Sequence, residues 1–298
     1  MNETSSASGR PLWLLLAPAI FLVLWSGGYS IAKLGILHAE PLTFLALRYA
    51  AVLIILAPFA IAMKPAWPTK PAQWFHIAFV GFLIQGVYFG LCYLAFNAGA
   101  SAGTVAIIVC LQPILVGLIA PYFARERVSA LRWLGLVLGL AGAATVILGQ
   151  SAVKAESIFG ILCSIGALIG ITAGTLWEKR FGVSHHPIVS NMVQYVAGLA
   201  STLPLALATE TLAVDWTSPE FYASFAYLVI ANSLISMTLL LAMIRAGEVS
   251  RVSSLFYLVP PVATLMAWPI LGEAMPPLAW LGMGIAAIGV AIASRRSA

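Results

Sequence analysis

Apolar stretches long enough to cross a lipid bilayer recur along the whole chain, and only short polar segments separate them. A spanning helix needs about 20 predominantly apolar residues. Charge and turn residues mark the breaks, as at His38-Ala39-Glu40-Pro41 and at Arg125-Glu126-Arg127. The pattern predicts ten helices, over residues 12–32, 41–63, 72–98, 103–124, 131–150, 158–178, 187–208, 220–244, 252–271 and 278–294.

The amino-acid composition also indicates that most of the chain lies in a lipid bilayer. Hydrophobic residues make up 61% of the 298 positions and charged residues only 8%, with a mean hydropathy of +1.00. A soluble domain carries about 25% charged residues. The sequence therefore predicts an all-α integral membrane protein, with the lipid bilayer as its main partner. The first apolar run is too long for a secretory signal and is interpreted as a retained helix.

The net charge of +5 follows the predicted topology and does not indicate a nucleic-acid partner. With the N-terminus inside, the outer loops hold only Lys33 and Lys154, and Arg48 falls within a span. This bias predicts that both termini are cytoplasmic. The other twelve of the fifteen basic residues lie on the inner side: Arg10, Lys64, Lys70, Arg125, Arg127, Arg132, Lys179, Arg180, Arg245, Arg251, Arg295 and Arg296.

The chain contains an internal duplication. At an offset of 147, twelve residues of the first half meet identical residues in the second half, including Pro113, Glu126 and Trp133. An offset of 146 pairs Lys33 with Lys179 and Tyr49 with Tyr195. We therefore predict two five-helix repeats, residues 1–150 and 151–298. Five is an odd number, so the second repeat enters the membrane in the opposite sense, an inverted arrangement typical of secondary transporters.

Several short motifs resemble a known family. They are Trp25-Ser26-Gly27-Gly28, Arg48, Pro113, Leu271-Gly272-Glu273 and Trp280-Leu281-Gly282. In order and spacing this set resembles the EamA family of the drug/metabolite transporter superfamily, although Ala124-Arg125-Glu126 departs from the usual Leu-Gly-Glu. The resemblance implies a bacterial inner-membrane exporter of small metabolites. Size and helix count are most similar to the YddG-type aromatic amino-acid exporters.

Two amides fall at matching depths, because Gln85 and Asn232 are 147 residues apart. Polar groups deep in a membrane normally face protein or a water-filled cavity. We expect both amides to line a cavity near the pseudo-twofold axis, with Ser236 beside Asn232, and to bind the ammonium or carboxylate of a substrate. The alternative is that each amide only bonds to a neighbouring helix.

Aromatic residues at similar depths suit an aromatic or long aliphatic substrate side chain. The candidates are Trp25, Tyr29, Tyr88, Tyr93, Trp177 and Tyr257, with Gln112 as a further amide. For each of these side chains, core packing is the alternative role. Pro113 and Pro260 are expected in the middle of two equivalent helices, where a kink could act as a hinge or merely bend the helix.

Arg48 has a neutral repeat partner, Gln194, so its charge is not part of the symmetric set. We expect Arg48 to tie loop carbonyls or Glu40, in preference to binding a substrate carboxylate. None of the ten acidic residues falls at a predicted midplane, which favours facilitated export without obligatory proton coupling.

The missing motifs also exclude enzyme classes. No GxxxxGK[ST] loop and no membrane aspartate pair is present, and the four histidines lie near span ends or in loops, so ATP hydrolysis and intramembrane proteolysis are not expected. We expect no cofactor, no metal and no catalytic residue, a small amino acid-like metabolite as substrate, and a monomer or weak homodimer. A carrier of nucleotide sugars or drug-like cations, a proton-coupled antiporter, and a channel or sensor stay as alternatives.

Overall fold

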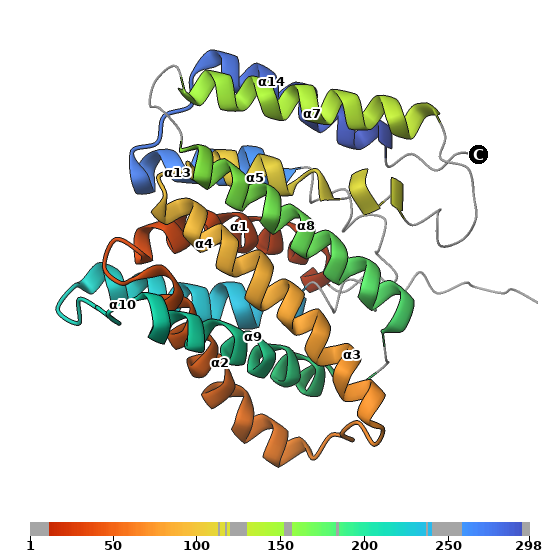
Figure 1. Ribbon diagram of the computed structural model, residues 1–298, viewed down its shortest axis with the longest axis vertical. Helices are drawn as coiled ribbons and strands as arrows, with labels where there is room; N and C mark the ends of the chain where they lie inside the picture. Colours follow the sequence, from red (N-terminus) through yellow and green to blue (C-terminus); the bar gives the residue numbers. More distant parts are fainter. Residues whose placement is uncertain are drawn as a thin grey trace, which may run out of the picture.

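The computed structural model is a bundle of helices with short connections (Figure 1). It describes residues 12–112, 114–116, 118–119, 130–151, 157–182, 185–236, 238–239 and 258–293. The first repeat holds α1 (Leu12–Gly35), α2 (Pro41–Met63), α3 (Pro71–Gly81), the π-helix η1 (Phe82–Phe89), α4 (Gly90–Asn97), α5 (Ala102–Val109) and α7 (Ala130–Ser151). The second holds α8 (Ile158–Phe181), α9 (Pro187–Thr209), α10 (Pro219–Ala226), the π-helix η2 (Tyr227–Ser236), α13 (Val259–Leu271) and α14 (Pro277–Ala293).

Helix is found within each of the ten predicted spans, so the helical periodicity of the chain is confirmed. Among the described residues, five helices are long and apolar enough to cross a membrane. They are Leu16–Gly35, Pro41–Met63, Pro71–Asn97, Ile158–Phe181 and Pro187–Thr209. Large apolar side chains such as Ile61, Ile158 and Leu148 are exposed on the outside of the bundle, as lipid-facing positions require.

The last helices of the two repeats, α7 and α14, lie along each other, and glycines occur where their backbones approach (Figure 1). A Cβ at Gly142 would meet the backbone of Ala286, and a Cβ at Gly149 would meet the backbone of Ala279. Residue numbers therefore rise along one helix as they fall along the other. Equivalent helices of the two repeats run antiparallel here, with glycine allowing the close approach.

A second equivalent pair, α2 and α9, is also antiparallel. Tyr49 and Tyr195, which the repeat relates, lie with their ring centroids 5.5 Å apart. At one end of the pair, the carboxylate of Glu210 accepts hydrogen bonds of 2.8 and 2.7 Å from the backbone N–H groups of Leu42 and Thr43. A carboxylate at a helix N-terminus satisfies unpaired donors and complements the helix dipole. This bond fixes the end of α9 to the start of α2.

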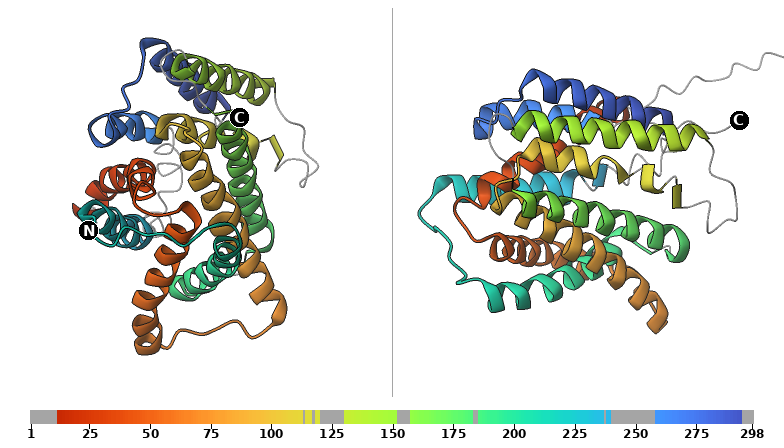
Figure 2. Two further views of the ribbon diagram at one scale, coloured as in Figure 1. Left: turned by 60° about the vertical axis from the view of Figure 1, so that its left-hand side comes forward. Right: turned by 45° about the horizontal axis from the view of Figure 1, so that its top comes forward.

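The first helix of each repeat packs on the other repeat. Helix α1 contacts α13 and η2, whereas α8 contacts α4, η1 and α5 (Figure 2). The two repeats are therefore interleaved, and the region between them is enclosed by helices from both.

The π-helices occupy matching positions in the two repeats. Phe82–Phe89 becomes 229–236 when shifted by the repeat offset, and η2 spans Tyr227–Ser236. The Ser236 hydroxyl donates 3.0 Å to the carbonyl of Ala231, five residues earlier, in the wider register. π-Helical turns are rare and occur frequently at functional sites. Each of these two segments carries one of the predicted amides, Gln85 or Asn232.

The prediction of a mid-helix proline is wrong for Pro260. Helix α13 begins at Val259, so Pro260 lies in the first turn, where a missing backbone N–H leaves no helical bond unmade. Pro113 lies outside the described residues. Just before it, α5 ends at Val109 and a turn at Cys110 and Leu111 precedes the helical Gln112.

Substitution of Gly142 should destabilise the α7–α14 pair. In Gly142→Ala the added methyl group meets backbone atoms of Ala286, which cannot move aside. We expect a loss of about 1–3 kcal/mol in the free energy of unfolding, measured by denaturant titration in detergent micelles. Gly284→Ala on the same helix pair is the control, because a Cβ there meets nothing within 4 Å. Equal stability of the two variants would contradict glycine-mediated packing.

Candidate functional site

A cavity of about 190 Å³ lies between the two repeats, and we call it the central cavity. Its walls come from α1, α2, η1, α8, α9 and η2, together with Gln112 beyond α5. Equivalent elements of both repeats therefore contribute. The lining residues are Trp25, Arg48, Ile84, Gln85, Tyr88, Phe89, Gln112, Ile171, Thr175, Gln194, Tyr195, Asn232 and Ser233.

Arg48 brings a positive charge to the central cavity from α2. Its side chain is only 2% exposed. Nε and Nη2 donate 3.0 and 2.9 Å to the hydroxyl of Ser233, and Nη2 also donates 2.9 Å to Oδ1 of Asn232. Nη1 donates 3.3 Å to the hydroxyl of Tyr93, and the guanidinium carbon lies 4.9 Å from the ring centre of Phe89. These are neutral partners.

The expected tie between Arg48 and Glu40 or loop carbonyls is wrong. The carboxylate of Glu40 instead accepts 2.9 Å from the backbone N–H of Ala213 and 3.1 Å from the hydroxyl of Thr211. The bond from Ala213 holds the pKa of Glu40 below its usual range. Arg48 points inward because η2 presents two oxygens, on Asn232 and Ser233, at the position that its guanidinium reaches.

Asn232 is held on both sides of its amide. While Oδ1 accepts from Arg48, Nδ2 donates 3.3 Å to the carbonyl of Leu24 on α1. A Cβ at Gly28 would lie 2.5 Å from Nδ2, so the absence of a side chain there leaves room for the amide. Asn232 thus connects α1 to Arg48 and positions the guanidinium.

Gln85 lies at the equivalent place in η1 but is bonded differently. The side chain is 3% exposed, and its Oε1 is buried without a hydrogen-bond donor among the described residues. The backbone carbonyl of Gln85 accepts 2.6 Å from the hydroxyl of Tyr49. The absence of a side chain at Gly198 lets α9 approach this turn, because a Cβ there would lie 2.5 Å from the Cβ of Gln85. A buried acceptor without a donor costs about 1–3 kcal/mol, so a bound donor would stabilise it.

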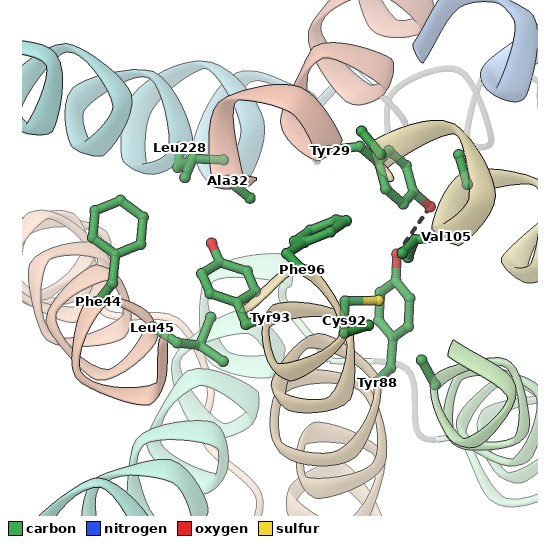
Figure 3. Close-up of a cluster of buried hydrophobic side chains, with 14 of the residues drawn as sticks. Tyr29, Ala32, Phe44, Leu45, Tyr88, Cys92, Tyr93, Phe96, Val105 and Leu228 are labelled. Atoms are coloured by element: carbon green, nitrogen blue, oxygen red, sulfur yellow. Dashed lines mark hydrogen bonds between the residues drawn. The ribbon is translucent and has the colours of Figure 1, made fainter. Parts of the chain in front are cut away.

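Tyrosines from α1, η1 and α4 lie beside the central cavity and line two smaller hollows. The hydroxyls of Tyr29 on α1 and Tyr88 on η1 are 3.2 Å apart, and Figure 3 shows them pointing toward each other across the gap between their helices. Tyr29 and Tyr88 also line the two smaller hollows, of about 20 and 30 Å³. Tyr93 lines the smaller one. Trp25, Tyr29 and Tyr88 therefore line both small hollows, and Tyr93 lines one of them.

Gln112 contributes a third amide to the central cavity. Its Nε2 donates 2.7 Å to the hydroxyl of Thr175, which in turn donates 2.8 Å to the carbonyl of Ile171 on its own helix. This pair links the first repeat to α8. Thr175 was not among the predicted residues, and no polar spacing along α8 identifies it.

Other predicted residues lie elsewhere. Trp177 packs in an aromatic cluster with Phe79 and Phe181, each at a centroid distance of 4.6 Å, and does not line the central cavity. Ser236 is buried, and its hydroxyl bonds within its own helix, so Ser233 is the serine of η2 that faces Arg48. Tyr257 lies outside the described residues.

One end of the bundle is tied by an ion pair. The ammonium of Lys33, at the end of α1, contacts Glu273, just past α13, and donates 2.6 Å to the carbonyl of Ala100. The other carboxylate oxygen of Glu273 accepts 3.0 Å from the backbone N–H of Ala102 at the start of α5. Three helix ends from both repeats thus meet at one carboxylate. The described acidic residues do not line the central cavity.

Filling the space beside Asn232 should disturb the site. Gly28→Ala places a methyl group against the amide and forces it away from the carbonyl of Leu24 or from Arg48. Because a buried charge then loses a partner, we expect a loss of about 1–3 kcal/mol of stability. Thermal unfolding in detergent measures this loss. Gly90→Ala is the matched control, since a Cβ there has no neighbour within 4 Å. The same melting temperature for both variants would argue against this role of Gly28.

Comparison with known proteins agrees with this architecture. A solved crystal structure has the same fold at a TM-score of 0.64, with 17% identity over 94% of this chain and 96% of that one. The inner membrane transporter YedA of Escherichia coli is 22% identical over 91% of this chain and 87% of its own length. The chain is thus a multi-pass membrane protein that is similar, along most of its length, to a transporter of the Escherichia coli inner membrane.

Two further relatives carry names that include a solute. The riboflavin transporter of Vibrio cholerae is 23% identical over 94% of this chain and 91% of its own length. The probable amino-acid metabolite efflux pump of Escherichia coli is 22% identical over 92% of each chain. The model of the EamA-like transporter family matches twice, at residues 11–148 and 158–295, which are displaced by the repeat offset found in the sequence. The chain is a membrane transporter and belongs to the EamA-like transporter family.

Proposed function

We propose that the protein exports small amphipathic metabolites, amino acids with aromatic side chains among them, by facilitated alternating access through the central cavity. The observation that carries the proposal is the enclosure of this cavity by matching elements of both repeats, with Arg48 and Gln85 beside Trp25 and Tyr88. A cavity with polar groups next to aromatic rings suits a solute with one polar and one apolar end.

Inverted topology and cytoplasmic termini belong to the same proposal. The antiparallel packing of α7 on α14 and of α2 on α9 supports opposite insertion of the two repeats. The basic residues support cytoplasmic termini. In such transporters the site lies between the repeats, and rocking of one against the other exposes it to each side in turn.

The relatives' names are compatible with a cavity that binds ring systems, because one names riboflavin and another an amino-acid metabolite. A buried guanidinium in the cavity disfavours drug-like cations, which like charge repels. Facilitated transport is favoured because the described carboxylates lie away from the cavity, whereas a proton-coupled carrier commonly uses an acid within the membrane.

Counterflow in proteoliposomes tests the function directly. Vesicles loaded with phenylalanine, tryptophan, leucine, threonine or riboflavin are assayed for uptake of the labelled solute. We expect uptake of the aromatic amino acids without an imposed proton gradient. In Gln85→Ala, uptake should fall about tenfold, because the substrate loses a hydrogen-bond partner to a charged group. Asn232→Ala should fall by a similar factor through displacement of Arg48.

Thr209→Ala is the control, because its hydroxyl bonds only to a carbonyl of its own helix and is exposed. Wild-type vesicles that take up none of the amino acids would contradict the proposed function. Uptake that requires an imposed proton gradient would contradict facilitated transport alone.

Removal of the ion pair between Lys33 and Glu273 tests alternating access. In Glu273→Gln the carboxylate no longer binds Lys33, so the helix ends of α1, α13 and α5 separate more often. Cys92, buried beside the smaller hollow, can serve as the reporter once Cys110 and Cys163 are replaced by alanine. We expect an impermeant thiol reagent to modify Cys92 in whole cells about fivefold faster, the factor that corresponds to about 1 kcal/mol.

Glu40→Gln removes a carboxylate that bonds only to the segment after α9, and it should leave the modification rate unchanged. A rate in Glu273→Gln equal to that of this control would show that the ion pair does not govern access.

A further inference from the structure

The guanidinium of Arg48 is a buried charge at the central cavity that only neutral groups compensate among the described residues. It is 2% exposed, and its hydrogen-bond acceptors are the neutral oxygens of Asn232, Ser233 and Tyr93. Among the residues that the structure describes, no carboxylate pairs with it. A buried charge without a counter-ion costs several kcal/mol. Arginine cannot escape this cost by losing its proton, because a guanidinium stays protonated in proteins.

The guanidinium also has an unused donor. The four bonds engage the hydrogen on Nε, both hydrogens on Nη2 and one on Nη1. Among the residues that the structure describes, one N–H of the five therefore has no partner. Because Arg48 lines the central cavity, a solute in the cavity can reach this group. An anion bound in the cavity would both balance the positive charge of Arg48 and accept a hydrogen bond from this N–H group.

Gln85 gives an independent indication of the same solute. Its Oε1 is buried, receives no hydrogen bond from the described part of the chain, and belongs to a side chain that lines the same cavity. An acceptor of this kind suits an ammonium group. The cavity thus presents a cation for a carboxylate and an acceptor for an ammonium, with the rings of Trp25, Tyr88 and Phe89 nearby.

We propose that Arg48 binds the carboxylate of the transported solute and that Gln85 accepts a hydrogen bond from its α-ammonium group. The substrate class is then the zwitterionic α-amino acid with an apolar side chain. This inference rests on the proposed function and narrows it. The repeat partner of Arg48, Gln194, lines the cavity without a charge, so the solute is bound in one orientation across the pseudo-twofold axis.

Competition with matched solutes tests the proposal in the wild-type protein. Labelled phenylalanine counterflow is competed by phenylalanine, phenylalaninamide, phenethylamine and 3-phenylpropionate, which differ only in the polar end. We expect the amide and the amine, which lack the carboxylate, to compete about 10- to 100-fold more weakly than phenylalanine. Equal competition by the amide would overturn carboxylate binding while the measured flux still supports transport.

A binding measurement tests the role of Arg48 independently of transport activity. Thermal stabilisation of the purified protein by the same four compounds should favour phenylalanine over its amide, whether or not flux is seen. Stabilisation by phenylalanine without flux would support the binding site and contradict the transport function. Equal stabilisation by the acid and the amide, or none by any carboxylate, would overturn the role of Arg48.

Substitutions of Arg48 and Gln85 test which residue recognises which polar group of phenylalanine. Arg48→Gln, which copies the repeat partner, should bind phenylalanine and its amide with equal affinity, whereas Arg48→Lys should keep part of the preference because the charge remains. Gln85→Leu should lose the advantage of phenylalanine over 3-phenylpropionate and keep its advantage over the amide. A folded Arg48→Gln protein that still prefers the acid would refute the proposal.

Discussion

The structure is organised around a guanidinium that sits inside an apolar helical bundle and cannot lose its charge. Arg48 comes from α2 of the first repeat, while Asn232 and Ser233, which bond it, come from η2 of the second. Asn232 continues the chain of bonds to the carbonyl of Leu24 on α1. A single hydrogen-bonded unit therefore joins three helices at the cavity wall, and its compensation is incomplete until an anion arrives. The need to stabilise this charge explains both the close approach at Gly28 and the burial of polar oxygens here.

Duplication accounts for where this unit lies, and divergence between the repeats accounts for its chemistry. The two π-helices occur at equivalent positions and face the same cavity. Their amides differ in bonding: Asn232 is bonded at both ends, whereas the side-chain oxygen of Gln85 accepts no hydrogen bond from the residues that the structure describes. In the same way Arg48 and Gln194 are equivalent in place and different in charge. Symmetry thus builds the cavity, and the differences make its two sides chemically distinct.

The helices and the duplication were predictable because hydrophobic periodicity and repeated Trp, Pro and Glu are local properties of the sequence. Gln85, Asn232, Trp25 and Tyr88 were predictable for the same reason, since depth along a helix follows from residue number. The direction of a side chain around the helix does not follow from residue number, especially where a π-helical turn changes it. Sequence depth therefore indicates Ser236, whereas Ser233 is the serine that bonds Arg48. Repeat symmetry does not predict that Arg48 faces the cavity, because its partner Gln194 is neutral and its hydrogen-bond acceptors come from a distant segment, η2. Trp177 resembled a cavity residue in depth, but its ring packs against Phe79 and Phe181 on another side of α8.

In the proposed binding mode, the solute occupies the space between the repeats, with its polar end at Arg48 and its ring beside Trp25 and Tyr88. Photolabelling with a diazirine-bearing phenylalanine, followed by peptide mass spectrometry, tests this placement. We expect adducts on α1 and η1, at Trp25, Tyr29 or Tyr88, that excess phenylalanine prevents and excess phenylalaninamide does not. Phenylalanine-sensitive adducts on the groove between α2 and α9, at Phe59 or Ile188, would contradict it.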